Sequence, residues 1–187
     1  MDLPAHIAAT TVAVCVFGAF AWAIRFHFAA AKMPVAMQML SLLGLTTFVI
    51  FLWQLWASPA GMLSFSAGVV LEGVALAIFV AAVRQTTVRQ LPIAFENAVP
   101  QFLLRGGIYA YVRHPFYSAY MCFWIGCGLE ARSLYYWLCF SLLVVIYFRT
   151  AWFEEKSFAN SPFAADYAEY QKSTGMFIPK FRSLRRL

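Results

Sequence analysis

Charge is scarce in this chain. Only 12% of its 187 residues are Asp, Glu, Lys or Arg, whereas 63% are hydrophobic. Soluble domains carry about 25% charged residues, so this composition, with a mean hydropathy of +0.71, excludes an ordinary water-soluble domain. Long uncharged runs must be solvated by lipid or by one another. We therefore expect an all-α integral membrane protein.

The sequence also lacks the patterns of metal, redox and nucleotide-loop sites. His6 and His27 stand alone near the ends of the first apolar run, and we interpret them as interfacial. The Gly126–Glu130 segment follows no predicted strand, which favours helix packing and a turn over a glycine-rich nucleotide loop. We predict no metal site and interpret the four cysteines as core residues, because they form no Cys-x-x-Cys and lie in apolar runs: Cys15, Cys122, Cys127 and Cys139.

Apolar runs of about 20 residues indicate membrane-spanning helices. The fourth run is short, and we expect it to form a hairpin with the fifth through the 130–133 turn. A C-terminal amphipathic segment continues to Tyr170, with an interruption at Pro162. We thus predict about five transmembrane helices, at Ala5–Ile24, Val35–Ala57, Ser64–Val83, Phe116–Leu129 and Leu134–Ala151.

Basic residues test this topology, because they accumulate on the cytoplasmic side of short loops. Five spans with the N-terminus outside put 13 of the 14 Lys and Arg residues on one side and only Arg132 on the other. We therefore expect a cytoplasmic C-terminus. A signal peptide is the less favoured interpretation of the first run, because no basic residues precede it.

The net charge of +6 fits contact with anionic membrane lipid. The basic tail (Lys180, Arg182, Arg185 and Arg186) lies on the same predicted side, and nucleic-acid binding is not expected. Short loops favour a bacterial or archaeal inner membrane. The oligomeric state stays open.

The chain divides into two parts of one membrane domain. Residues 1–83 form three predicted anchor helices with little polarity, and residues 84–187 carry most polar groups. Glu72 is the exception in the anchor part, because a carboxyl in mid-span is costly unless it meets a partner or cavity. We favour a helix-packing role beside Gly68 and Gly73, with a role in lining a ligand cavity as the alternative.

Polar residues gather between the third and fourth runs. The step Arg113-His114-Pro115 predicts the start of the fourth helix, since proline suits a first helical turn. Free backbone N–H groups there would favour an anionic ligand group. Glu154 and Glu155 follow the fifth run, where they either form a solvated helix face or enclose a polar pocket with the arginine and histidine.

These motifs resemble the isoprenylcysteine carboxyl methyltransferase family and its bacterial relatives. The resemblance covers Gly107 to Pro179. It rests on Gly-x-Tyr-x-x-x-Arg-His-Pro-x-Tyr from Gly107 to Tyr117, the paired glutamates, the Tyr167-x-x-Tyr170 element and a closing Ile-Pro. The broader superfamily also contains phospholipid N-methyltransferases.

The resemblance implies S-adenosylmethionine as the cofactor, a lipid-borne acceptor that enters between helices, and an isoprenylcysteine-type carboxylate as the favoured acceptor. It implies Arg113 and His114 as catalytic residues, with Arg149 as a candidate for the acceptor carboxylate. Tyr167, Tyr170 and Lys172 are the implied substrate residues. The implied cofactor-binding residues are Tyr109, Arg113, His114, Pro115, Tyr117, Glu154 and Glu155.

Two positions depart from the family pattern. Ser173 stands where the family has an arginine, and Ala164 stands where it commonly has a glycine. If the arginine binds the acceptor carboxylate, Lys172 or Arg149 takes its place here, or the acceptor differs. The alternatives are a phospholipid amine N-methyltransferase and, in another class, a non-catalytic membrane scaffold or lipid-binding protein.

Overall fold

The computed structural model describes residues 3–28, 33–58, 61–87, 91 and 100–180, and these residues are helical apart from loops and one isolated bridge. Basic residues at 32, 89 and in the tail beyond 180 lie outside the described ranges. The elements are α1 (Leu3–Trp22), the π-helical turn η1 (Ala23–His27), α2 (Val35–Ala57), α3 (Met62–Thr86), the 3₁₀ turn η2 (Gly107–Ala110), α4 (Pro115–Ala131), α5 (Leu134–Ala159) and α6 (Ala164–Ser173).

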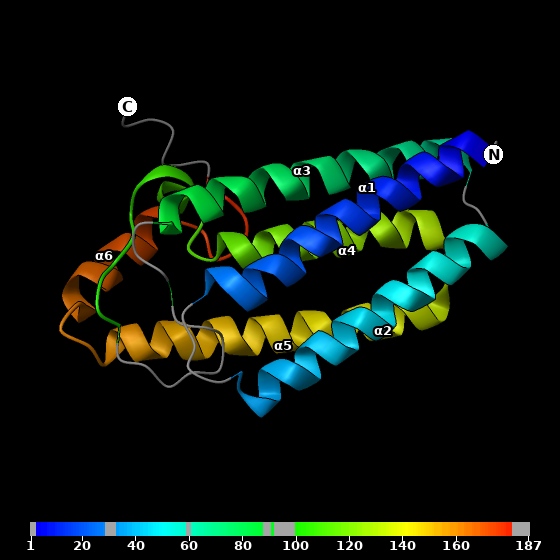
Figure 1. The fold of residues 1–187 in the computed structure, drawn as a ribbon. Helices are drawn as coiled ribbons and strands as arrows, with labels where there is room; N and C mark the ends of the chain where they lie inside the picture. The colour runs from blue at the N-terminus through cyan, green and yellow to red at the C-terminus, as the bar shows by residue number, and fades with distance from the viewer. Residues whose placement is uncertain (1–2, 29–32, 59–60, 88–90, 92–99, 181–187) are drawn as a thin grey trace.

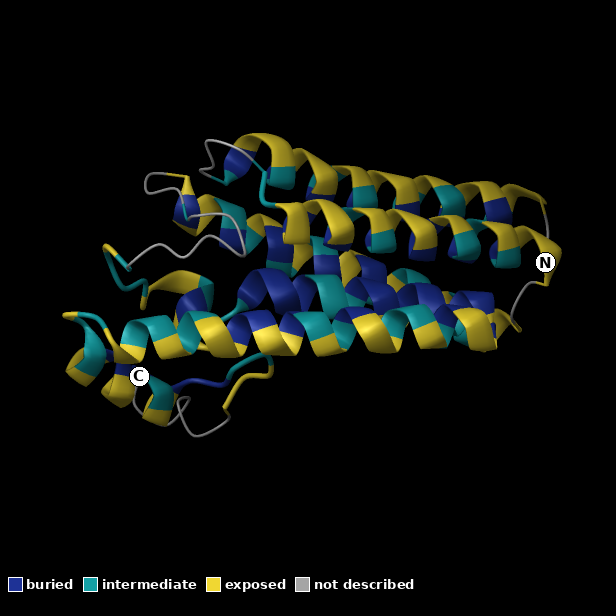
Figure 2. Ribbon diagram, turned by 90° about the horizontal axis from the view of Figure 1, so that it is seen from below, coloured by how far each residue is buried: buried dark blue, intermediate teal, exposed yellow. Residues whose placement is uncertain are grey.

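The five long helices form one bundle with α4 inside it. Figure 1 shows α3 lying along α4 and α1 along α3, while α2 packs against α5. Buried residues occupy most of α4, whereas the other long helices keep exposed apolar faces outside (Figure 2). Such faces suit lipid, so the chain is an integral membrane protein of the all-α class.

Within the described residues, four helices are long and apolar enough to cross a membrane: α1 with η1, α2, α3 and α5. The remaining predicted span, α4, has 17 residues, about 26 Å at 1.5 Å per residue against a hydrocarbon thickness of about 30 Å. It is short, as expected, and its neighbours cover it. Which side of the membrane each terminus faces stays a prediction.

The start and end of α4 follow local sequence. Pro115 is the first helical residue, as predicted. At the other end Arg132 adopts the left-handed conformation with φ 48° and closes the hairpin to α5. Helix α5 then continues to Ala159, beyond the predicted Ala151, and so carries Glu154 and Glu155 on its last turns.

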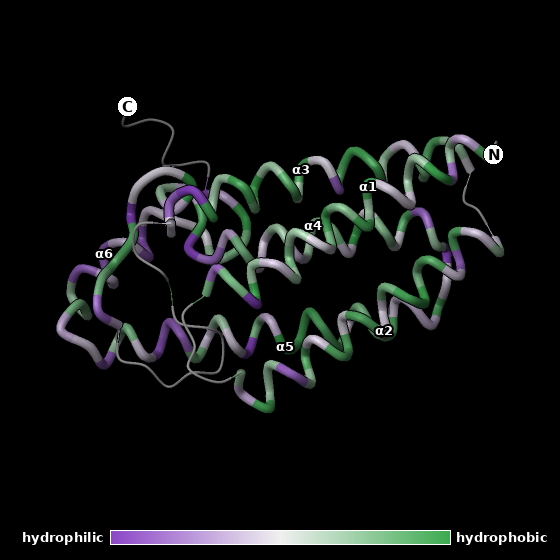
Figure 3. The backbone as a smooth tube through the Cα atoms, viewed as in Figure 1, coloured by the Kyte–Doolittle hydropathy of each residue, from purple (hydrophilic) through white to green (hydrophobic). Residues whose placement is uncertain are grey.

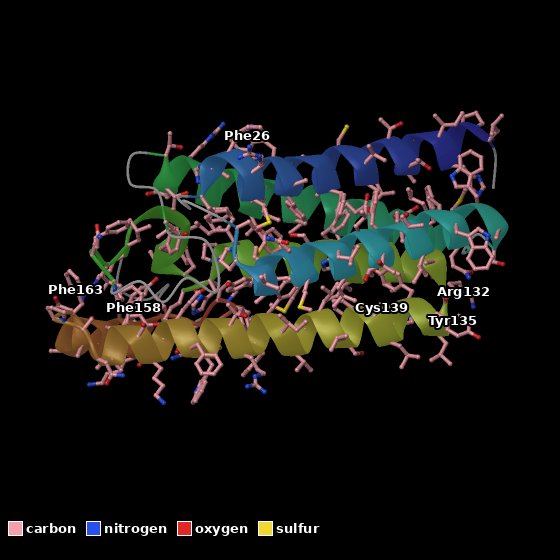
Figure 4. All side chains as sticks on the ribbon, turned by 60° about the horizontal axis from the view of Figure 1, so that its bottom comes forward. Phe26, Arg132, Tyr135, Cys139, Phe158 and Phe163 are labelled. Atoms are coloured by element: carbon pink, nitrogen blue, oxygen red, sulfur yellow. The ribbon has the colours of Figure 1, made fainter. Side chains whose placement is uncertain are left out.

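Polarity separates the two ends of the bundle. Figure 3 shows hydrophilic residues gathered around α6 and the loop before α4, whereas the long helices are largely hydrophobic. Figure 4 places Phe158 and Phe163 at this end, which we call the α6 end, and Arg132 and Tyr135 at the opposite end. The candidate residues converge at the α6 end.

One expectation about single residues is wrong and one stays a prediction. His6 and His27 are buried in the protein, near the two ends of the span formed by α1 and η1, and His27 Nε2 lies 2.7 Å from the Thr86 hydroxyl. Their place at the membrane interface stays a prediction. Among the cysteines only Cys127 is a core residue, because Cys15 is exposed and the other two are half-buried. The exposed Cys15 face suits contact with lipid, and an apolar sequence run does not distinguish a lipid-facing residue from one buried in protein.

Candidate functional site

The loop before α4 begins with a turn that packs against the end of α3. Gly107 has φ +58°, and a Cβ on it would lie 2.3 Å from the Gln85 Nε2 atom. A side chain there would meet both the backbone penalty of the left-handed region and the Gln85 amide. The glycine therefore lets η2 pack on α3 and sets the path of the chain towards His114.

A second segment, after α6, fixes this loop from the other side. Val112 and Gly175 form a parallel bridge, in which Arg113 N donates to Gly175 O at 2.8 Å and His114 N donates to Met176 O at 3.1 Å. A Cβ on Gly175 would lie 1.6 Å from Ile178 O, so only glycine fits this turn. The two N–H groups just before α4 are thus already bonded to carbonyls, and only those inside its first turn remain for an anion.

Four charged side chains meet at the α6 end: Arg113, His114, Glu154 and Glu155, which we call the Arg-His-Glu cluster. Arg113 Nε donates to Glu155 Oε1 at 2.8 Å, and Arg113 Nη1 donates to Thr174 O at 2.6 Å. His114 Nε2 lies 3.1 Å from the same Glu155 oxygen, and His114 Nδ1 lies 3.3 Å from Glu154 Oε2. The imidazole therefore bridges the two glutamates.

The protonation of His114 follows from these neighbours. Burial by itself lowers the pKa of the imidazole, but hydrogen bonds to Glu154 and Glu155 outweigh it, so that the pKa is raised above its ordinary value. An imidazolium donates from both nitrogens, which matches a carboxylate on each side. Both nitrogens are thus occupied, and His114 positions the carboxylates instead of offering a free base.

The two glutamates of the cluster differ in exposure and in how many hydrogen bonds they already accept. Glu155 is 12% exposed and accepts from Arg113, from His114 and, at 2.7 Å, from Gln171 Nε2. Glu154 is 41% exposed and accepts from the Tyr117 hydroxyl at 2.7 Å. Glu155 is therefore saturated, whereas Glu154 is the carboxylate of the cluster that is open to a ligand.

Aromatic rings extend the site towards the bundle interior. The Tyr117 ring stacks on His114 at 5.8 Å and on Tyr147 at 5.6 Å between centroids. Tyr120 lies 6.3 Å from Tyr117 and 5.9 Å from Tyr147. Because ring faces are electron-rich, this group of tyrosines suits a cation next to the carboxylates.

Tyr109 contributes a hydroxyl without a described partner. Its oxygen is buried and makes no hydrogen bond within the described chain. Burial first, then the neighbouring Tyr170 and Glu154, raise the pKa of Tyr109, so the hydroxyl stays neutral. A buried, unbonded hydroxyl costs about 1–3 kcal/mol, and a polar ligand group would relieve that cost.

Helix α6 packs against the loop before α4 and against the end of α5. The Tyr170 hydroxyl donates to Tyr109 O, and the Tyr167 ring stacks on Phe158 with centroids 4.6 Å apart. Both tyrosines are buried. These contacts hold the loop and α5 to α6, while the role of the two tyrosines towards substrate stays a prediction.

The structure brings most predicted residues together, with two exceptions. Arg149 and Lys172 are exposed, and neither pairs with a carboxylate in the described ranges. Arg149 instead lies over the Phe153 ring at 5.9 Å. Of the arginines and lysines that the sequence suggested for the site, only Arg113 lies in the cluster, and it is paired with Glu155. Lys180 lies nearby, with its Nζ atom 2.7 Å from the Gln171 carbonyl oxygen.

Sequence reasoning missed the residues that complete the cluster from the C-terminal side. Gln171 bonds Glu155, the Thr174 carbonyl accepts from Arg113, and the Phe177 carbonyl accepts from Ser118 Oγ at 2.7 Å. Two of these contacts use backbone carbonyls, which leave no trace in residue type. Only the position of Gln171, next to the Tyr-x-x-Tyr element, offered a signal.

Comparison with known proteins gives one positive result. No curated protein matches the chain. The family model described as phospholipid methyltransferase matches residues 64–166, a range that begins in α3 and includes Arg113, His114, Glu154 and Glu155. The matched range covers more than half of the chain, and the chain therefore belongs to the phospholipid methyltransferase family.

Proposed function

We propose that this protein is a membrane methyltransferase that uses S-adenosylmethionine and methylates an acceptor carried by a lipid. The observation that carries the proposal is the Arg-His-Glu cluster, with one open carboxylate, beside stacked tyrosines at one end of a membrane bundle. Family membership supports methyl transfer. The cofactor and the acceptor are the parts that we add.

The residues present fit the chemistry of the proposed cofactor. Glu154 is half-exposed and can accept from a ribose diol or an ammonium group. The buried Tyr109 hydroxyl has no described partner and can bond a further polar group. Tyr117 and Tyr120 provide ring faces for a positively charged sulfonium.

Methyl transfer asks little of the protein beyond alignment. When bound, the cofactor would supply an electrophilic methyl group and would leave as a thioether once the acceptor has taken the methyl. An amine acceptor must also lose a proton before its nitrogen attacks, and water at the exposed side of Glu154 can take up that proton. The protein must orient both reactants and exclude water. Stacked, buried tyrosines and a cluster fixed by α4, α5 and the segment after α6 provide such a rigid support.

The described residues favour an amine as the acceptor over the isoprenylcysteine-type carboxylate that the sequence suggested. A carboxylate acceptor needs a cation, yet Arg113 is bonded to Glu155 and Thr174, and Arg149 and Lys172 are exposed. An amine headgroup, by contrast, attacks as an uncharged nitrogen and needs no cation beside it. We therefore propose a phospholipid amine as the first acceptor to test and prenylcysteine as the second.

A methyl-transfer assay tests the proposal. The purified protein in lipid nanodiscs, given S-adenosylmethionine with a labelled methyl group, should label lipid in the presence of phosphatidylethanolamine. The His114→Ala variant should fail to do so, because the cluster loses its bridging imidazole. Methyl transfer to prenylcysteine but not to the phospholipid would show that the acceptor is a carboxylate. Transfer to neither acceptor would favour the non-catalytic scaffold.

A further inference from the structure

A second acidic pair lies away from the cluster, in the contact between α3 and α4. The same sequence pattern, Gly-x-x-Leu-Glu, occurs on both helices, as Gly68–Glu72 and as Gly126–Glu130. The two helices run in opposite directions in the bundle (Figure 1). Each glutamate can thus lie opposite the glycine of the other helix.

The contacts show this reciprocal arrangement. A Cβ on Gly68 would lie 2.5 Å from Glu130 Cγ, and a Cβ on Gly126 would lie 3.2 Å from Glu72 Cγ. The same two glycines also bring the backbones together, since either Cβ would lie 2.8 Å from the carbonyl oxygen of the other glycine. On each helix the glutamate lies four residues, roughly 6 Å, beyond its glycine, so both carboxyls lie close to the point where the two helices touch.

Both carboxyls are completely buried, and their oxygens are mostly unbonded. Glu72 and Glu130 each have 0% exposure. Glu72 Oε1 accepts from Cys127 Sγ at 3.3 Å, but Glu72 Oε2 and both Glu130 oxygens accept no hydrogen bond in the described structure. This is the reverse of the Arg-His-Glu cluster, where Glu155 has three donors.

No cation within the described ranges pairs with either carboxyl, because every described ion pair involves another acid. The other titratable groups near the pair are two thiols of α4 and one phenol of α5. Cys127 is already named, Cys122 Sγ donates to Leu71 O at 3.4 Å, and the Tyr136 hydroxyl donates to Trp124 O. On α1, Cys15 is exposed and the His6 ring lies tilted against Trp56, with centroids 5.5 Å apart. Helix α2 has no titratable residue.

An ionised carboxylate in this position would be uncompensated. Burying an unpaired charge in a membrane protein is costly enough that the group neutralises instead. A neutral carboxylic acid also gains an O–H donor, which a carboxylate lacks. Neutrality thus removes the charge and supplies a donor between two acceptor-rich side chains.

We propose that Glu72 and Glu130 form a proton-binding site inside the bundle, in which both carboxyls carry a proton at neutral pH. The protonated pair lets α3 and α4 approach at Gly68 and Gly126. Helix α3 also carries Gln85, which packs against Gly107 in the loop that leads to the cluster, and α4 begins directly after His114. The site is separate from the proposed cofactor site, since Glu130 lies 16 residues beyond His114, about 24 Å along α4.

Infrared spectroscopy of the intact protein in lipid tests this proposal directly. At neutral pH the wild type should show the carbonyl stretch of protonated carboxylic acids, shifted in D₂O. Glu72→Gln and Glu130→Gln should each remove part of this band, and the double variant should remove all of it. Glu169→Gln, which changes an exposed acid on α6, should leave it unchanged.

Two results would overturn the proposal: no protonated-acid band in the folded wild type, or a full band in the double variant. If the double variant does not fold, the wild type grown with ¹³C-labelled glutamate decides instead. The band must then move with the label, and an unmoved band contradicts the assignment. None of these infrared measurements depends on methyl transfer, so their outcome is independent of the proposed function.

Discussion

The protein contains two pairs of glutamates, which differ in whether described cationic side chains compensate them. Glu154 and Glu155 lie at the α6 end, where Arg113 and the His114 imidazolium compensate them. Glu72 and Glu130 lie inside the bundle, without a described cation and with three unbonded oxygens. The cluster stays charged because it has partners, and we propose that the buried pair is neutral because it has none.

This difference shows what each pair can do. A charged pair with one open carboxylate can attract a cationic ligand, since charge-assisted hydrogen bonds are the strong ones. A neutral pair between two glycines can hold helices together but offers nothing to a ligand from water. Burial of a carboxyl is therefore a poor guide to a site unless its partners are known.

Glu155→Gln should have the largest effect on the charged side of this comparison. It removes the carboxylate that compensates both Arg113 and His114, and breaking a largely buried pair costs about 3–5 kcal/mol. We expect a clearly lower midpoint of thermal unfolding in detergent. Glu169→Gln serves as the control on exposed α6, and equal midpoints for the two variants would show that the cluster does not hold this end together.

Gly68→Ala tests the close contact of the other pair. The new methyl would lie 2.5 Å from Glu130 Cγ, and overpacking of this kind costs typically about 1–3 kcal/mol. Gly73→Ala is the matched control on the same helix, because nothing lies within 4 Å of a Cβ there. Thermal unfolding should separate the two variants; a Gly73 variant as unstable as the Gly68 variant would contradict the close approach.

Tyr117→Phe should have a smaller effect, confined to the charged pair. The change removes one hydrogen bond to Glu154 and keeps the stacked ring, a loss of about 0.5–1.5 kcal/mol. Cofactor affinity measured by calorimetry should fall by about two- to tenfold. Tyr135→Phe, at the exposed far end of α5, should leave the affinity unchanged.

The stability of the cluster should also depend on pH through His114. Its pKa in the folded state is raised above the ordinary 6.5, so the stabilisation is complete below the unfolded pKa and is lost as pH rises through the raised folded value. The unfolding midpoint of the wild type should therefore fall as the pH rises above about 6.5. The midpoint of His114→Gln should fall less over the same range. Parallel curves would contradict an imidazolium between the glutamates.

Arg149→Ala and Lys172→Ala should have the smallest effects. Both side chains are exposed, and exposed charges contribute at most about 1 kcal/mol. Cofactor affinity should change less than about fivefold. A complete loss of acceptor methylation in either variant, with cofactor binding intact, would return that residue to the acceptor site.

Much of the fold was accessible from the sequence because membrane helices leave long uncharged runs. The start of α4 at Pro115 and the bounds of α2 were correct. The extension of α5 to Ala159 was missed, since hydrophobicity ends at the membrane boundary while the helix does not. For the site, the family resemblance implied that Arg113, His114 and the two glutamates lie together, whereas the residue types alone also allowed a solvated helix face at Glu154 and Glu155. The bonds of the loop to Gly175 and Met176 involve backbone atoms that no side-chain pattern encodes.

The burial of Glu130 shows another limit of sequence reasoning. Its position beside a turn suggested only the end of a helix, yet it is completely buried against Gly68. The signal was the Gly-x-x-Leu-Glu pattern repeated in two helices. That repeat gains meaning only once the helices are known to pack in opposite directions.

Calorimetry with S-adenosylmethionine tests whether the protein binds this cofactor through the open Glu154 carboxylate. The wild type should bind it saturably, and Glu154→Gln should weaken binding by about 10- to 100-fold, because a hydrogen bond to a charged group contributes about 1.5–3 kcal/mol. Glu72→Gln should bind like the wild type. A folded wild type that binds no cofactor, or a Glu154→Gln variant that binds it equally well, would contradict the proposed cofactor site.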